Sequence, residues 1–340
     1  APAAAVPHFA RQYEVSCGMC HTMVPKLNET GEEFFANGYR FPGFPPASPG
    51  TLPMSALVQA RAENFISKDA DRTHFREVEL IVAAPLGEKG GSYFVEWLPF
   101  NNQFKSNGTT SNRSGCFEDI VVTVPVGRSG SLALGQFRAA SQVDVSRRLS
   151  ISTPLAFGAK TGSFGISSRS PGFGYSYFQP DKPGDVVNGW THGIVVPFPG
   201  ELTLNDDFSL RSRPEGVFLE SYKRAGLSST GGYLFLGQGG VLGGVVGVLE
   251  RGKIFSTLNI GFATRDDDIR VSFENEYLDS EHFAVGVRFE RQGGAANRTA
   301  GVFWVDIDTP TTMHTTRWRA EYRVGKGDRQ QFTMQLDALF

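Results

Sequence analysis

Apolar and polar residues alternate strictly through the C-terminal half of the chain. In the stretch 283–290, Phe283, Val285, Val287 and Phe289 alternate with Ala284, Gly286, Arg288 and Glu290. Successive side chains of a β-strand point to opposite faces, so a period of two predicts strands with one apolar and one polar face. The pattern recurs at 254–262, 269–277, 303–307, 317–324 and 332–340. With similar runs from about Val58 onward, we expect roughly sixteen antiparallel strands.

Two antiparallel architectures produce this alternation: a soluble β-sandwich, and a membrane barrel with an apolar outer face and a wet interior. Arg and Glu share the polar faces of successive strands, which suits a water-filled lumen crossed by ion pairs. Single-chain bacterial barrels have even strand numbers, and about sixteen is even. A chain that finishes on an alternating strand with Phe340 also resembles the assembly signal of bacterial outer-membrane barrels. We therefore expect a transmembrane β-barrel, with the sandwich as the alternative.

The segment Cys17-Gly18-Met19-Cys20-His21 has the spacing of a covalent haem c attachment site. Two intervening residues let both thiols reach the haem vinyl groups while the following imidazole faces the iron. We expect one haem c bound by Cys17 and Cys20, with His21 as the proximal iron ligand. A thioredoxin-like pair or half a zinc site also uses Cys-x-x-Cys. However, no second cysteine pair completes a zinc cluster, and no βαβ pattern surrounds the motif. Cys116 is the one cysteine outside the motif.

The sixth iron ligand is expected to be a Met or His away from the motif. After a short predicted helix at residues 29–37, closed by Gly38, a proline-rich stretch leads to Met54. Small c-type cytochromes present a Met thioether to iron from such a loop, so Met54 is the candidate distal ligand. In the alternative, Met54 is a core or strand-entry residue, and His8, His74 or water binds instead.

Charge and hydropathy exclude other classes of protein. The 33 basic and 35 acidic residues nearly cancel, so the chain lacks the positive field of a nucleic-acid-binding protein. No stretch approaches about eighteen consecutive apolar residues, so no transmembrane helix is expected. The chain begins Ala1-Pro2-Ala3 without an initiator Met, which is typical of a mature exported protein and indicates export.

The N-terminal segment resembles that of the fused monohaem cytochrome c–porin family, typified by the outer-membrane iron oxidase of iron-oxidising bacteria. The resemblance rests on Phe9-Ala10-Arg11-Gln12 before a single haem motif, on Gly38-Tyr39 after the short helix, and on the β-rich remainder ending in Phe340. It implies oxidation of extracellular Fe(II), an iron-oxidising oxidoreductase activity, with electrons passed to a periplasmic cytochrome. Cys17, Cys20 and His21 match the family motif. The match in motif covers about the first forty residues, and the remainder matches by pattern.

These observations predict two parts, a monohaem cytochrome c segment at 1–56 that can plug the barrel and an outer-membrane β-barrel at 57–340. The expected function is electron transfer from an extracellular donor, Fe(II) in the leading hypothesis, through one haem to a periplasmic carrier. The expected surroundings are the outer-membrane lipid of a Gram-negative bacterium, with no nucleic acid. The alternative is a periplasmic c-type cytochrome whose soluble β-domain docks into a larger redox or photosynthetic complex.

Overall fold

The computed structural model describes residues 6–48, 52–65, 70–87, 90–104, 110–112, 114–141, 148–161, 164–200, 213–264, 268–294, 297–310, 315–326 and 330–340. Short elements come first: α1 (Pro7–Tyr13), the 3-10 helix η1 (Cys17–Met19), β1 (His21–Met23), β2 (Lys26–Leu27) and α2 (Glu29–Ala36). The predicted helix at 29–37 is thus confirmed, and Gly38 follows it with a φ of 64°. Among the described residues, no helix is long and apolar enough to cross a membrane.

Long antiparallel strands make up most of the remaining chain. They are β3 (Met54–Phe65), β4 (Ala70–Leu86), β5 (Gly91–Phe104), β7 (Cys116–Val126), β8 (Gly130–Arg138), β11 (Arg169–Pro180), β12 (Gly189–Pro197), β13 (Gly216–Ala225), β14 (Ser228–Gly237), β15 (Gly240–Arg251), β16 (Ile254–Ala263), β17 (Asp268–Ser280), β18 (Phe283–Gln292), β19 (Arg298–Pro310), β20 (Thr315–Val324) and β21 (Gln331–Leu339). The three-residue β6 (Thr110–Asn112) pairs with the end of β5.

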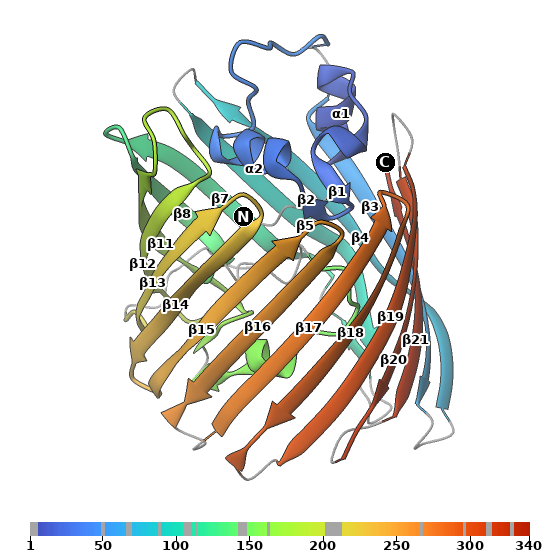
Figure 1. Ribbon diagram of the computed structural model, residues 1–340. Coiled ribbons are helices and arrows are strands. Elements are labelled where there is room, and N and C mark those ends of the chain that lie inside the picture. Colours follow the sequence, from blue (N-terminus) through green and yellow to red (C-terminus); the bar gives the residue numbers. More distant parts are fainter. Residues whose placement is uncertain are drawn as a thin grey trace.

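Pairing of β21 with β3 closes these strands into a barrel (Figure 1). The sixteen long strands described above form the wall, as the alternation predicted. β3 begins at Met54, where Met54 pairs with Val82, rather than at residue 57. Between β8 and β11, the 3-10 helix η3 (Leu155–Gly158) and the hairpin of β9 (Lys160–Thr161) and β10 (Phe164–Gly165) lie inside the barrel.

The two faces of the wall are chemically distinct. On β16, Leu258, Ile260 and Phe262 point outward with 42%, 38% and 40% of their surface exposed, whereas Phe255 and Asn259 are buried inside. A closed sheet satisfies its backbone groups internally, and an apolar outer face suits lipid. The chain is therefore an outer-membrane β-barrel of the Gram-negative type. The soluble sandwich, and with it the periplasmic alternative, is wrong because the sheet is closed and its outer face is apolar.

The interior of the barrel contains protein as well as polar side chains. One apolar cluster joins α1, α2 and η3 to inward residues of the wall, among them Ile81, Phe94, Phe218 and Phe235. The opposite wall, β17 to β20, carries buried charged residues such as Glu274, Arg288, Glu290, Arg317 and Glu321. The lumen predicted to hold water crossed by ion pairs is thus partly filled by the chain itself.

Candidate haem site

Residues 6–48, which we call the plug, lie in one mouth of the barrel (Figure 1). Arg40 donates hydrogen bonds to the backbone oxygens of Leu86 and Gly91, at 3.1 Å each, in the turn between β4 and β5. Two ion pairs tie the plug to the wall: Glu32 to Arg224 at 2.5 Å, and Lys26 to Glu276 on β17. The plug is therefore docked onto the barrel by polar contacts at several points around the mouth.

The mouth that holds the plug carries the short turns of the barrel. β13 and β14 turn between Ala225 and Ser228, and β15 and β16 turn between Arg251 and Ile254. The long connections, from Arg138 to Arg169 and from Pro197 to Gly216, leave the opposite end. Outer-membrane barrels have short periplasmic turns and longer extracellular loops. The plug therefore lies at the periplasmic end.

Asn28 fixes the predicted haem-binding loop on α2. Its side-chain oxygen accepts from the Gly31 backbone N–H at 3.0 Å and caps the helix, while its amide nitrogen donates to the Gly18 and Met19 carbonyls at 3.2 and 3.1 Å. Gly31 is required here, because an added Cβ would lie 2.1 Å from the Cys20 carbonyl oxygen. Asn28 is not among the predicted site residues, although an Asn directly before a predicted helix is a recognisable capping signal.

Cys17, Cys20 and His21 line one hollow in the plug. The rest of its lining is mainly apolar and aromatic, and includes Phe9, Tyr13, Phe34 and Phe41. The hollow has a volume of about 660 Å³, including space open to solvent. Two thiols, one imidazole and an aromatic wall form the donor set and surroundings that a covalently bound porphyrin needs. These residues fit haem c, and the structure brings three of the four predicted site residues together.

The two thiols differ from those of a redox-active pair. Burial raises the pKa of Cys20 to about 11. Burial also raises the pKa of Cys17, and the nearby carboxylates of Asp308 and Glu281 act in the same direction. Thioredoxin-like motifs instead depress a cysteine pKa to generate a reactive thiolate. The raised pKa values of Cys17 and Cys20 therefore argue against the thioredoxin-like alternative.

Met54, the fourth predicted residue, lies outside the lining of this hollow in the described part of the chain. It opens β3, its side chain is 38% exposed, and its carbonyl accepts from Arg11 Nη2 at 2.7 Å. Its role as distal ligand stays a prediction. Cys116 is the first residue of β7, and it carries no disulfide.

His8 links the plug to the barrel wall. Its Nε2 lies 2.8 Å from the Ala83 carbonyl oxygen and its Nδ1 lies 3.3 Å from Ser55 Oγ. A carbonyl can only accept, so Nε2 carries the proton and Nδ1 accepts from the Ser55 hydroxyl. The ring is fully buried. This bonding occupies both ring nitrogens and leaves His8 poorly suited to be the alternative sixth ligand.

Acid is expected to weaken docking of the plug through His8. Burial lowers its pKa to about 4, and the charge of Arg11 adds to this, against the opposing bond to Ala83. When the plug undocks, the pKa returns to about 6.5. The stabilisation is therefore complete above pH 6.5 and is lost as pH falls toward 4, by roughly 3 kcal/mol in total. After division by the intrinsic exchange rate at each pH, the protection of the α1 amides should fall from pH 7 to pH 5 in the native chain and much less in His8→Gln. An equal fall in protection in both proteins would contradict this assignment.

Solved structures with a similar fold are bacterial porins. The chain is similar to Salmonella typhi OmpF, crystallised in complex with daunomycin, with a TM-score of 0.60 and 11% identity over 84% of this chain and 97% of that one. It is also similar to a mutant of the Rh. blastica porin, with a TM-score of 0.56 and 11% identity over 84% and 99%. For Pseudomonas aeruginosa OpdQ the TM-score is 0.50, with 9% identity over 84% and 96%.

No protein-family model and no curated protein matches the sequence. At these identities the likeness to porins describes architecture, and it agrees with the closed sheet and the apolar outer face. The chain has the fold of a sixteen-stranded outer-membrane porin, with a plug in its periplasmic mouth that carries Cys17, Cys20 and His21.

Proposed function

We propose that the chain is an outer-membrane electron-transfer cytochrome of the fused cytochrome c–porin type. In this proposal it takes electrons from an extracellular donor, Fe(II) being the leading candidate, and passes them through one covalent haem c to a periplasmic carrier protein. If Fe(II) is the donor, the chain is an iron-oxidising oxidoreductase. The observation that carries the proposal is the shared position of Cys17, Cys20 and His21 on an aromatic hollow in the periplasmic mouth.

Each part of the plug has a role in this proposal. Bound haem supplies a one-electron couple, Cys17 and Cys20 hold it covalently, and His21 binds its iron. Asn28 keeps the loop that carries these residues on α2. The aromatic lining excludes water and therefore favours the less charged state of the iron site. The periplasmic position of the hollow supports direct contact with a soluble carrier, while the donor side faces the lumen.

Stopped-flow absorbance of the detergent-purified native protein tests this function. Adding Fe(II) should produce the reduced haem spectrum, and a subsequent soluble c-type cytochrome should return it to the oxidised form. The proposal fails if the native protein carries haem that no external one-electron donor reduces, or if no haem is attached at all.

The sixth ligand is tested by the spectrum of the oxidised protein. If Met54 binds iron, the native protein has a sulfur-to-iron charge-transfer band near the red end of the visible range, and Met54→Leu removes that band. The same substitution should lower the reduction potential, because a thioether stabilises Fe(II). Met19→Leu serves as a matched control, since this thioether lies within the motif and is expected to leave the band unchanged. A band that survives in Met54→Leu would exclude Met54 as the ligand.

A passive solute channel is the second candidate, and the porin fold favours it. In that case haem is incidental, and a variant lacking both Cys17 and Cys20 keeps its function. The plug and the protein inside the lumen weigh against this candidate, because they occupy the path that a solute would take.

A further inference from the structure

The connection between β8 and β11 continues inside the barrel rather than over its rim. Half of its described residues 148–161, which we call the inner segment, are buried, and only Thr153 and Lys160 among them are exposed. Leu149 and Ala156 are 0% exposed, and Phe157 is 2% exposed. A buried segment without regular pairing must find partners for its backbone N–H and C=O groups elsewhere.

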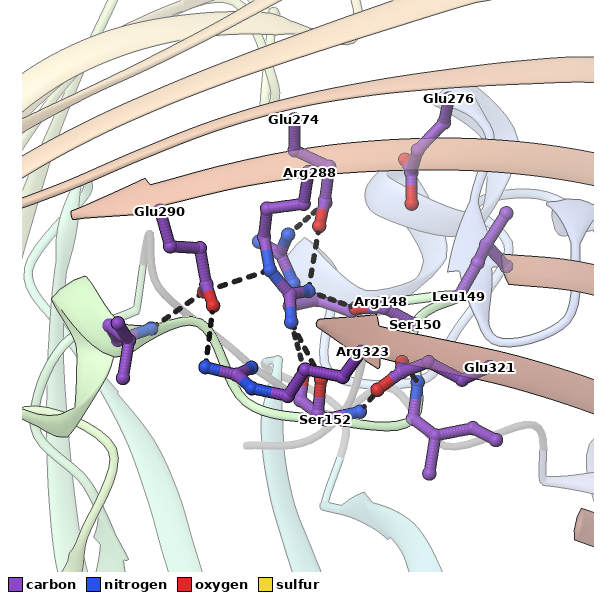
Figure 2. A network of polar contacts seen from close by, with 12 residues as sticks. Arg148, Leu149, Ser150, Ser152, Glu274, Glu276, Arg288, Glu290, Glu321 and Arg323 are labelled. Carbon is purple, nitrogen blue, oxygen red and sulfur yellow. Dashed lines mark hydrogen bonds and ion pairs between the residues drawn. The ribbon is translucent and has the colours of Figure 1, made fainter. Parts of the chain in front are cut away.

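Side chains of the charged wall supply those partners (Figure 2). Glu321 accepts hydrogen bonds from the backbone N–H groups of Ile151 and Ser152 at 2.8 and 3.0 Å. Glu290 accepts from the Leu155 N–H at 2.8 Å. Three partly buried N–H groups of the inner segment are therefore held by two carboxylates on β20 and β18.

Arginines of the same wall bind the carbonyl groups of the inner segment. Arg288 donates to the carbonyl of Ser152 at 3.0 Å and to the hydroxyls of Ser150 and Ser152 at 2.8 and 2.7 Å. Arg317 reaches the Leu149 carbonyl and Arg270 the Leu155 carbonyl, each at 3.3 Å. Charge-assisted bonds to both donors and acceptors fix the segment against β17, β18 and β20.

The other side of the inner segment packs on the apolar wall. Ala156, Phe157 and Ala159 belong to the same buried cluster as Phe218 and Phe235. Just beyond the segment, Phe164 stacks on Phe235 with ring centroids 4.1 Å apart. The chain inside the barrel therefore spans the lumen from its charged side to its apolar side.

The contacts along β17 show which of the two, the plug or the inner segment, lies nearer the outside of the cell. This strand starts at its loop end with Asp268 and runs to its turn end at Ser280. Arg270 binds Leu155 and Glu274 pairs with Arg148, both in the inner segment, whereas Glu276 pairs with Lys26 of the plug. The inner segment thus lies on the extracellular side of the plug.

We propose that the inner segment seals the lumen, so that solutes entering from outside stop before they reach the plug. Between the two obstructions lies a chamber lined by Lys26 and Leu27 of the plug, Phe157 of the inner segment, and Thr257 on β16. In this arrangement electrons can cross the barrel through protein while solutes do not. The seal is held by Glu321, Glu290 and Arg288.

Access to Thr257 from outside tests the seal. Thr257→Cys is made in the haem-loaded full chain carrying Cys116→Ala, and whole cells are treated with a membrane-impermeant thiol reagent. We expect this cysteine to be protected, and Arg298→Cys, at the exposed loop end of β19, to be labelled rapidly. Adding Glu321→Ala and Glu290→Ala removes the acceptors of three partly buried N–H groups. This should raise the labelling rate by at least roughly tenfold, because each lost bond to a charged group changes an equilibrium by about that factor.

The matched control removes an ion pair of the same wall that joins β20 to β21, Arg319 to Asp337 at 2.5 Å. Arg319→Gln with Asp337→Asn should leave Thr257→Cys protected. Resistance of the barrel to SDS at room temperature confirms that each variant is folded. Labelling of Thr257→Cys as fast as Arg298→Cys while Glu321, Glu290 and Arg288 are all intact overturns the proposal. Unchanged protection in folded Glu321→Ala, Glu290→Ala also overturns it. The readout does not involve electron transfer, so its outcome is separate from that of the proposed function.

Discussion

Replacing both Cys17 and Cys20 by alanine is expected to give a folded barrel without covalent haem and without electron transfer. The wall should assemble because Cys17 and Cys20 lie in η1 and just after it, whereas closure depends on the pairing of β21 with β3. Without thioether bonds, the plug has only His21 to hold iron. Mass spectrometry of the purified protein should show loss of the haem mass, and reduction by Fe(II) should be undetectable.

Cys116→Ala is the matched control for that experiment. It removes the remaining cysteine, which lies on β7, outside the plug. This variant should keep full haem mass and native reduction kinetics. If the Cys17→Ala, Cys20→Ala double variant keeps its haem mass, the attachment site is wrong. If the native protein never carries haem, the electron-transfer proposal is wrong and the solute channel remains.

The barrel could be predicted from sequence because its signal is local. Each strand places every second residue on the same face, so Ile260 and Phe262 identify the outer face and Glu274 and Glu276 the inner face without knowledge of the neighbouring strands. Closure adds only the pairing of the last strand with the first. The candidate haem-binding residues could also be named from sequence, because the motif spans five consecutive positions, and their binding of haem stays a prediction.

The interior could not be predicted because its contacts join residues far apart in the chain. Ile151 meets Glu321, and Lys26 meets Glu276. The sequence of residues 148–161 did not mark them as buried, since Ser150, Ser152 and Pro154 are residue types that usually indicate a surface loop. Their burial depends on carboxylates and guanidinium groups that arrive from β17, β18 and β20. The aromatic hollow could not be predicted for the same reason, because it combines residues from α1, α2 and the loop that follows α2.

The apolar wall and the charged wall of the lumen hold the plug and the inner segment in different ways. A barrel that only passed solutes would have no use for an apolar patch inside, because that patch is costly in contact with water. Here the patch is covered by α1, α2 and the inner segment, so its burial stabilises docking of both. The charged wall instead sets the position of the inner segment by directed hydrogen bonds. Apolar contacts thus hold the plug and the inner segment on the wall, and the charged side chains fix the position of the inner segment.

An arginine introduced into the middle of the outer face is the second large perturbation that we expect. On β15, Val245 points outward with 53% of its surface exposed and lies near the middle of the strand. Val245→Arg would place a charge in the hydrocarbon core and should destabilise the folded protein by about 2–4 kcal/mol. Urea unfolding of the protein in lipid vesicles, followed by tryptophan fluorescence, measures this loss.

Leu249 provides the depth control on the same strand and face. It is 58% exposed and lies two residues from Arg251, with which β15 itself ends. An arginine side chain near the end of a strand can extend to the headgroups, so Leu249→Arg should cost only about 0–1 kcal/mol. The difference between the two sites is the diagnostic quantity, because a soluble protein would tolerate a surface arginine equally at both. Equal destabilisation by Val245→Arg and Leu249→Arg would therefore show that this face does not contact lipid. The seal and the plug would then have no membrane across which to act.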